Sequence, residues 1–277
     1  MNIDGWKYYN HAALPDCAPH ETPDDTPVKN NEIWKIANGK AILARWTTDY
    51  DCGYDTGWYY VVLDKPFNID SLKANRRYEI NKGNRNFEFR KIDCNIDCMD
   101  LYNVYTEAVK SYETVTPDSY ETFSTYIKSC SKRNDELFGA YHRESDKLCG
   151  YVLTNEKNGC ISLVTQKAIP EYEKYGLNAC LICGVCEYYH NDILKGKYIC
   201  DGEKAILHQT AFQLYLEKYF QFRKVFCKLN LRFRKPFGFA VTILYPFRKI
   251  IYKMNFLKKV SGILKMQEIV TSNNNKR

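Results

Sequence analysis

Apolar and polar positions follow two rhythms along the chain, one typical of strands and one typical of helices. Residues 1–31 follow neither, and their content of Pro, Asp, Thr and Asn predicts an irregular lead-in. Residues 68–86 predict a short basic helix. Asp70 or Ser71 is suited to cap this helix, and Gly83 is suited to end it. Three segments rich in β-branched and aromatic side chains predict strands: 41–48, 57–64 and 87–92.

The second half of the chain has a more regular order. Segments with a helical pattern predict four helices: 97–112, 118–132, 171–194 and 212–220. Segments with a strand pattern predict five strands: 137–143, 148–155, 160–169, 196–202 and 223–233. Two helices, a run of three strands and two helix–strand units therefore follow one another. Strands that alternate with helices in this way predict an α/β layer fold with a mixed sheet.

The composition is that of a globular protein with a sizeable core. Of the 277 residues, 45% are hydrophobic and 26% are charged. Twelve cysteines are scattered over a chain that is too long for a disulfide-stapled miniprotein. The sequence shows no secretory signal and no apolar run of about 20 residues that would span a membrane. We therefore expect a cytoplasmic protein with free thiols.

Positive charge is concentrated at the C-terminal end. Residues 223–277 contain fourteen Lys and Arg and one acid, Glu268, within a chain of net charge +7. These cations are interleaved with Phe, Tyr, Ile and Leu, so we expect a basic amphipathic tail over 234–277. Three interpretations of this tail stay open: contact with an anionic membrane surface through 223–265, a basic patch for tRNA, and a terminal helix that packs on the core.

The order of elements in the second half resembles the core of the GNAT N-acyltransferases. Arg76, Arg77, Lys82 and Gly83 stand before a predicted strand like an R-R-x-x-x-x-K-G pattern. The phrase "YLEKYFQFRKVFCKL" stands where F-K-x-x-F-G-F closes the domain. These two features resemble the Fem-type branch, the aminoacyltransferases and related acyltransferases of bacterial cell-envelope synthesis.

This resemblance implies a mixed-sheet α/β fold of the GNAT type in three segments. Residues 96–233 would form the GNAT-like core, and 234–277 the basic tail. Residues 1–95 would be a degenerate GNAT-like first half with its lead-in. The implied activity is transfer of an acyl or aminoacyl group to an amine on a cell-envelope or polysaccharide precursor. The chain would act in the cytoplasm, peripheral to the inner face of the membrane.

The resemblance also implies a donor site. GNAT proteins cradle a pyrophosphate on a loop of the pattern Q/R-x-x-G-x-G/A, at the N-terminus of the following helix. The corresponding phrase here is "EKYGLNA", which retains the central glycine but has Glu173 in the Q/R place. This departure disfavours coenzyme A and fits aminoacyl-tRNA or a lost activity, with acyl-CoA kept as the alternative donor. A glycine that only connects a strand to a helix is the structural alternative. The predicted donor-binding residues are Thr165, Gln166, Lys174, Tyr175, Gly176, Leu177 and Asn178.

In the resembled family an amine attacks the carbonyl directly in a ternary complex. The protein then has to accept a proton and stabilise an oxyanion, and no metal is needed. Asp201 and Glu203 follow a predicted strand and are candidates for the general base, although Asp and Gly also serve simple turns. His208 is a third candidate, as a proton shuttle or as a structural residue.

The cations of the predicted basic helix are candidates for an acceptor site. Arg76, Arg77 and Lys82 suit an anionic acceptor, such as a nucleotide-sugar or a lipid-linked glycan. A solvated basic helix face is the alternative. A non-catalytic GNAT-like binding module that has lost its donor site is the alternative for the whole chain.

A cysteine run raises a further alternative, an iron–sulfur or redox protein. Cys180, Cys183, Cys186 and His190 have spacings that resemble those of iron–sulfur ligands. In a straight helix, however, Cys180 and His190 are about 15 Å apart along the axis. The remaining circumference is apolar, so we predict a buried helix that packs directly behind the loop at Gly176.

Overall fold

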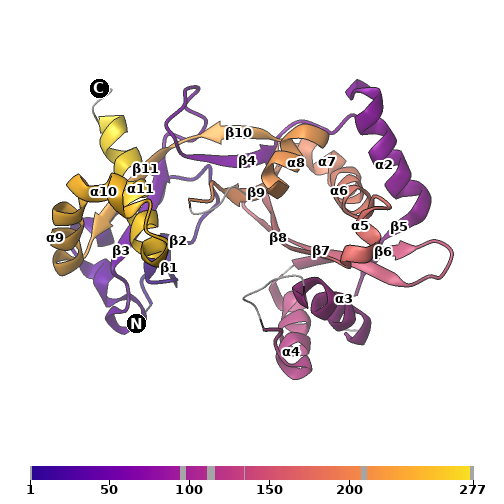
Figure 1. Ribbon diagram of the computed structural model, residues 1–277, viewed down its shortest axis with the longest axis horizontal. Helices are drawn as coiled ribbons and strands as arrows, with labels where there is room; N and C mark the ends of the chain where they lie inside the picture. Colours follow the sequence, from indigo (N-terminus) through magenta and orange to yellow (C-terminus); the bar gives the residue numbers. More distant parts are fainter. Residues whose placement is uncertain (1, 94–97, 111–115, 134, 207–210, 275–277) are drawn as a thin grey trace. The chain divides into compact units, whose positions relative to one another are not determined.

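The computed structural model describes residues 2–93, 98–110, 116–133, 135–206 and 211–274. They form two compact units (Figure 1). The second unit contains residues 62–202 and 212–223, and the first contains the remainder. Three strands are divided between the units: β4 (Tyr59–Leu63), β9 (Tyr198–Glu203) and β10 (Arg223–Phe226).

Among the described residues, the second unit is built on a mixed seven-stranded sheet with the order β10-β4-β9-β8-β7-β6-β5. Each strand from β5 to β7 pairs antiparallel with the next strand along the chain, and β9 pairs parallel to β8. Besides β4 and β10, the strands are β5 (Phe87–Ile92), β6 (Asp135–His142), β7 (Leu148–Lys157), β8 (Cys160–Ala168) and β9 (Tyr198–Glu203). The helices are α2 (Ala74–Asn86), α3 (Met99–Lys110), α4 (Tyr120–Cys130), α5 (Pro170–Glu173), α6 (Leu177–Tyr188), α7 (His190–Leu194) and α8 (Ala211–Tyr219).

Helices cover both faces of this sheet (Figure 1). Successive strand residues point to opposite faces. Leu137 of β6 belongs to a buried cluster with Leu101 of α3 and Ile127 of α4. The next residue, Phe138, packs its ring against Tyr188 on α6 with the centroids 4.7 Å apart. α3 and α4 therefore cover one face, and α6 covers the other.

The first unit contains a smaller sheet with the order β1-β2-β3-β11. Trp6 and Ile33 are among the buried residues of its core. The strands are β1 (Trp6–Tyr9), β2 (Ala12–Pro15), β3 (Leu43–Thr48) and β11 (Lys228–Phe233). The α-helices are α1 (Thr26–Lys29), α9 (Lys235–Leu244), α10 (Arg248–Ile251) and α11 (Lys258–Asn274).

The order predicted for the second half is confirmed from α3 onward. Three predicted details differ from the structure, two of them in this half and one at the N-terminal end. Residues 171–194 form three helices, since Gly176 and Tyr189 interrupt them, and residues 223–233 form two strands that belong to different sheets. Residues 1–31, predicted to be irregular, contain the β1–β2 hairpin.

The predicted cap and end of the basic helix are wrong. Asp70 and Ser71 lie in a short 3-10 turn, and α2 begins after Lys73 without a side-chain cap. Gly83 lies inside α2, which continues to Asn86. The glycine serves a close contact between helices, as described below. The division of the chain at residues 95/96 and 233/234 stays a prediction.

Candidate functional site

β8 and β9 pair over only three residues of each strand. Ser162 lies opposite Cys200 in the last pair, although β8 continues to Ala168 and β9 to Glu203. On its other side, β8 has an extra residue, Val164, between the partners of Thr154 and Leu153. Such a bulge bends a strand away from its neighbour. The facing edges of β8 and β9 beyond this point therefore have no ladder hydrogen bonds between them, which leaves backbone groups available to a ligand.

Gln166 connects this part of β8 to the first turn of α6. Its Nε2 donates to Oδ1 of Asn178 at 2.7 Å. Its Oε1 is buried and has no hydrogen-bond partner among the described residues. An unsatisfied buried amide oxygen costs about 1–3 kcal/mol. A ligand donor group would remove that cost, so two of the predicted donor-binding residues lie together at a place that suits a ligand.

α6 begins at Leu177, directly after Gly176 in the left-handed conformation with φ +85°. The first turn of a helix presents free N–H groups that attract anions. Here the backbone of α2 lies against this turn. A Cβ on Gly83 would be 2.4 Å from the carbonyl oxygen of Gly176. Nδ2 of Asn86 also donates to the carbonyl of Tyr175 at 3.1 Å.

This contact bears on coenzyme A as a donor. No atom larger than hydrogen fits between Gly83 and Gly176, so a pyrophosphate cannot enter on that side of the loop. The carbonyl of Glu79 lies near the same glycine, 3.2 Å from a Cβ placed there. The oxygen of this carbonyl carries a negative partial charge, whereas a phosphate group needs hydrogen-bond donors. The side of the loop that faces α2 is therefore closed to the pyrophosphate of coenzyme A.

The other predicted donor-binding residues have more ordinary surroundings. Thr165 lies opposite Leu153 in the β7–β8 ladder. Nζ of Lys174 lies 5.0 Å from the ring centroid of Tyr175, which is exposed. The side chain of Leu177 is fully buried, so it can offer a ligand only its backbone. Their role in binding a donor stays a prediction.

Asp201 follows Cys200, the last β9 residue that pairs with β8. Burial raises the pKa of its carboxyl group to about 6, against the weaker lowering effect of a hydrogen bond with Gln213. Gln213 is a buried residue of α8. A carboxylate with such a pKa is ionised at pH 7 and is a stronger base than an ordinary aspartate. It therefore has the position and the basicity of a proton acceptor where the two strands part.

Glu203 forms an ion pair with Arg45, and both belong to the first unit. The Arg45 guanidinium also lies 5.2 Å from the ring centroid of Trp58. Burial raises the pKa of the Glu203 carboxyl group, and Arg45 lowers it. The ion pair favours a structural role, and the catalytic role predicted for Glu203 stays untested. The third candidate, His208, lies outside the described residues.

The three predicted acceptor-binding cations all lie on α2, but they do not share one helix face. Nη1 of Arg77 donates to the backbone carbonyl of Asp70 at 2.9 Å. Arg76 and Lys82 are six residues apart, which is about 240° around a helix. An anionic acceptor would therefore contact only part of this set at one time, and its binding there stays a prediction.

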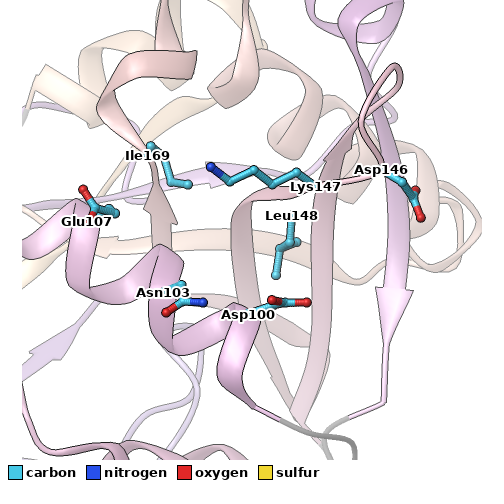
Figure 2. A pocket seen from close by; sticks show the side chains of 7 residues that line it. All are labelled: Asp100, Asn103, Glu107, Asp146, Lys147, Leu148 and Ile169. Atoms are coloured by element: carbon cyan, nitrogen blue, oxygen red, sulfur yellow. The ribbon is translucent and has the colours of Figure 1, made fainter.

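A pocket of about 330 Å³ lies between α3 and the start of β7, at the end of β8 (Figure 2). Figure 2 shows Lys147 extending across it toward Ile169. The pocket is lined by three carboxylates and one cation, Lys147, so its negative charge would repel a ligand that carries a phosphate group. The lining residues are Asp100, Asn103, Glu107, Asp146, Lys147, Leu148 and Ile169.

The cysteine run is confirmed as part of a buried helix. Cys180, Cys183 and Cys186 are each buried on α6. Burial raises the pKa of the Cys180 and Cys183 thiols to about 12, and it also raises the pKa of the Cys186 thiol well above its ordinary value. Among the described residues no group of His, Cys, Asp and Glu is arranged to hold a metal ion. These thiols are protonated side chains of the core.

A thiol reagent distinguishes this core role from a redox role. We expect a disulfide reagent to label the partly exposed Cys17 and Cys52 in the folded protein, because thiolates form only where water reaches. Cys180, Cys183 and Cys186 should react only after unfolding in urea. Mass spectrometry of peptides measures both sets. Rapid labelling of the α6 thiols in the folded protein, or bound iron, would contradict this account.

The sequence matches no protein-family model and no curated protein sequence. Solved structures are similar in fold. FemX has a TM-score of 0.55 at 8% identity, with 77% of each chain covered. The C-terminal domain of a putative lysylphosphatidylglycerol synthetase from Agrobacterium fabrum has 0.53 at 10%, covering 86% of this chain and 84% of that one. L-PGS from Bacillus licheniformis has 0.51 at 12%, covering 88% and 84%.

These similarities, together with the observed strand order, establish the fold class. The chain has a mixed α/β, GNAT-like fold with Fem-like structural relatives. At identities of 8 to 12% they establish nothing beyond the fold. Sequence inspection missed three features of the site: the buried Gln213, the bulge at Val164 and the contact at Gly83. Gln213 could have been recognised from the sequence, because it is a polar residue three positions before Leu216 and so lies on the buried face of α8.

Proposed function

We propose that this chain transfers an aminoacyl or acyl group to an amine, with Asp201 as the general base. The observation that carries the proposal is the position of Asp201. It follows the last β8–β9 pair, and burial raises the pKa of its carboxyl group to about 6. Perturbed carboxylates of this kind are typical of acid–base sites. The GNAT-like fold adds support by analogy.

The transfer is a direct displacement in a ternary complex. The amine nitrogen attacks the donor carbonyl carbon, a C–N bond forms, and the bond to the leaving oxygen or sulfur breaks. The proton lost by the amine passes to the Asp201 carboxylate, which then returns it to the leaving oxygen or sulfur. Backbone N–H groups of β8 beyond Ser162 would stabilise the oxyanion. Gln166 and Asn178 would contact the donor beside them.

The proposed donor is an aminoacyl-tRNA rather than acyl-CoA. The contact between Gly83 and Gly176 leaves a pyrophosphate no space on one side of the loop, and Glu173 replaces the Q/R residue of the GNAT pattern. One similar structure is named for lysylphosphatidylglycerol, whose lysyl group is attached to a lipid head group. That name accords with an aminoacyl donor.

The proposed acceptor is an amine on a cell-envelope or polysaccharide precursor, as the Fem-type resemblance implies. Arg76, Arg77 and Lys82 would bind its phosphate groups, since the pocket of Figure 2 is acidic. In this proposal the chain acts in the cytoplasm, peripheral to the inner face of the membrane. No helix of the described residues is long and apolar enough to cross a bilayer.

Transfer to a surrogate nucleophile tests this function without knowledge of the acceptor. The purified chain is incubated with hydroxylamine and either a mixture of radiolabelled aminoacyl-tRNAs or radiolabelled acetyl-CoA. We expect catalysed transfer from aminoacyl-tRNA and none from acetyl-CoA. Transfer from acetyl-CoA alone would overturn the donor assignment. Catalysed transfer from neither donor, with both bound weakly or not at all, would favour a non-catalytic binding module.

A further inference from the structure

The segment from α9 to the start of α11, residues 235–259, exposes apolar side chains. Every exposed Phe and Ile among the described residues lies in it: Phe237, Phe239, Ile243, Phe247, Ile250 and Phe256. Phe239 is 70% exposed, and Phe256 is 83% exposed. α9 has the apolar sequence "KPFGFAVTIL" and yet buries none of its residues. Exposed apolar side chains that are concentrated in one segment in this way usually mark an interaction site.

The segment is held in place by α11, so its exposure belongs to an ordered scaffold. Nε of Arg248 donates to Oε1 of Glu268 at 2.8 Å, and the hydroxyl of Tyr252 donates to Oε2 of the same residue at 3.1 Å. Ile251 between them is buried. Arg248, Ile251 and Tyr252 therefore attach the segment to the first unit, while most of its other residues stay exposed.

The positive charge of the segment indicates an anionic partner. Residues 235–259 contain six cations and no acid. Arg248 is paired with Glu268, which leaves five exposed lysines beside the apolar side chains: Lys235, Lys249, Lys253, Lys258 and Lys259. Apolar side chains bordered by lysines match the interface of an anionic bilayer, where acyl chains lie below negative head groups.

We propose that residues 235–259 bind the surface of an anionic membrane, with their phenylalanine and isoleucine side chains in the interface. A second copy of the same surface would bring five lysines against five lysines, which disfavours self-association. RNA would satisfy the lysines and stack on phenylalanine, but it offers no apolar environment to Ile243 and Ile250. This surface belongs to the first unit, and its binding to a membrane does not depend on the transfer chemistry.

Vesicle sedimentation tests this surface with the full chain. Vesicles of equal parts phosphatidylglycerol and phosphatidylcholine are compared with vesicles of phosphatidylcholine alone. We expect binding to the anionic vesicles, with at least a tenfold loss of affinity in the double variant Phe239→Ser/Phe256→Ser. Tyr9→Ser, which removes an exposed aromatic ring elsewhere in the first unit, should bind as the wild type does. Lys249→Glu/Lys253→Glu should also weaken binding.

A direct reporter separates insertion from attraction by charge. A tryptophan at position 239, introduced as Phe239→Trp, should shift its emission to shorter wavelength with anionic vesicles only. No vesicle binding at low salt would overturn the proposal, as would unchanged binding of the double serine variant. A dimer that this variant abolishes would instead assign the surface to a second copy. Vesicle binding without transferase activity would refute the proposed function alone, and activity without vesicle binding would refute only this surface.

Discussion

Replacing Asp201 by Asn is expected to reduce the rate of acyl transfer by about 10²–10⁴-fold, the usual effect of losing a general base. The amide keeps the size of the side chain and can keep a hydrogen bond to Gln213, but it cannot accept the amine proton. The loss should appear in kcat, with KM for the donor little changed. An initial-rate measurement over a range of donor concentrations separates the two parameters.

The same variant should be as stable as the wild type, or more stable, above pH 7. Burial raises the pKa of Asp201 to about 6, so folding favours its protonated form. The stability that this proton contributes is present at low pH and is lost as the pH rises through about 6. Asn avoids the cost of the buried charge, and the gain at pH 8 should be about 1–2 kcal/mol. A variant that loses both activity and stability would indicate a structural role.

Replacing Gly83 by Ala is expected to destabilise the second unit by about 3 kcal/mol, at the upper end for overpacking. An added Cβ would lie 2.4 Å from Gly176 O and 3.0 Å from Cys180 N, and both are backbone atoms that no rotamer change can move. α2 would have to separate from α6. The direction is diagnostic, because Gly→Ala inside a helix otherwise stabilises by about 1 kcal/mol.

Asn81→Ala provides the matched control on the same helix. Asn81 is exposed, so alanine there should raise stability by a few tenths of a kcal/mol through helix propensity. The midpoint of urea unfolding, followed by circular dichroism, measures both variants. A Gly83→Ala protein with an unchanged or higher midpoint would show that α2 does not lie against the loop at Gly176.

The fold of the second unit was predictable because its elements carry local signals. β5, α3 and α4 have hydrophobic periods of two or 3.6 residues, which record the faces they bury. The β1–β2 hairpin was not predictable in this way. Its turn depends on Asn10 and His11, both at positive φ, and asparagine followed by histidine is not a common turn pair. A hairpin of four-residue strands has too little periodicity to compensate.

The site shows a second limit, since contacts between distant segments leave no local pattern. Gly83 resembles a helix end when only its neighbours are considered. Its role becomes visible once Gly176, far along the chain, lies against it. Asp201 was predictable as a residue at a strand end, but its raised pKa depends on burial that only the folded unit creates.

The pH dependence of acyl transfer tests the central claim most directly. The rate constant kcat is measured from pH 5 to 8 with a hydrazide acceptor, whose nucleophilic nitrogen stays neutral across this range. We expect the wild-type rate to rise with pH and to reach half of its maximum near pH 6, where Asp201 loses its proton. Asp201→Asn should give a low rate without this inflection. An inflection near pH 6 that persists in the variant would contradict the assignment of Asp201 as the base.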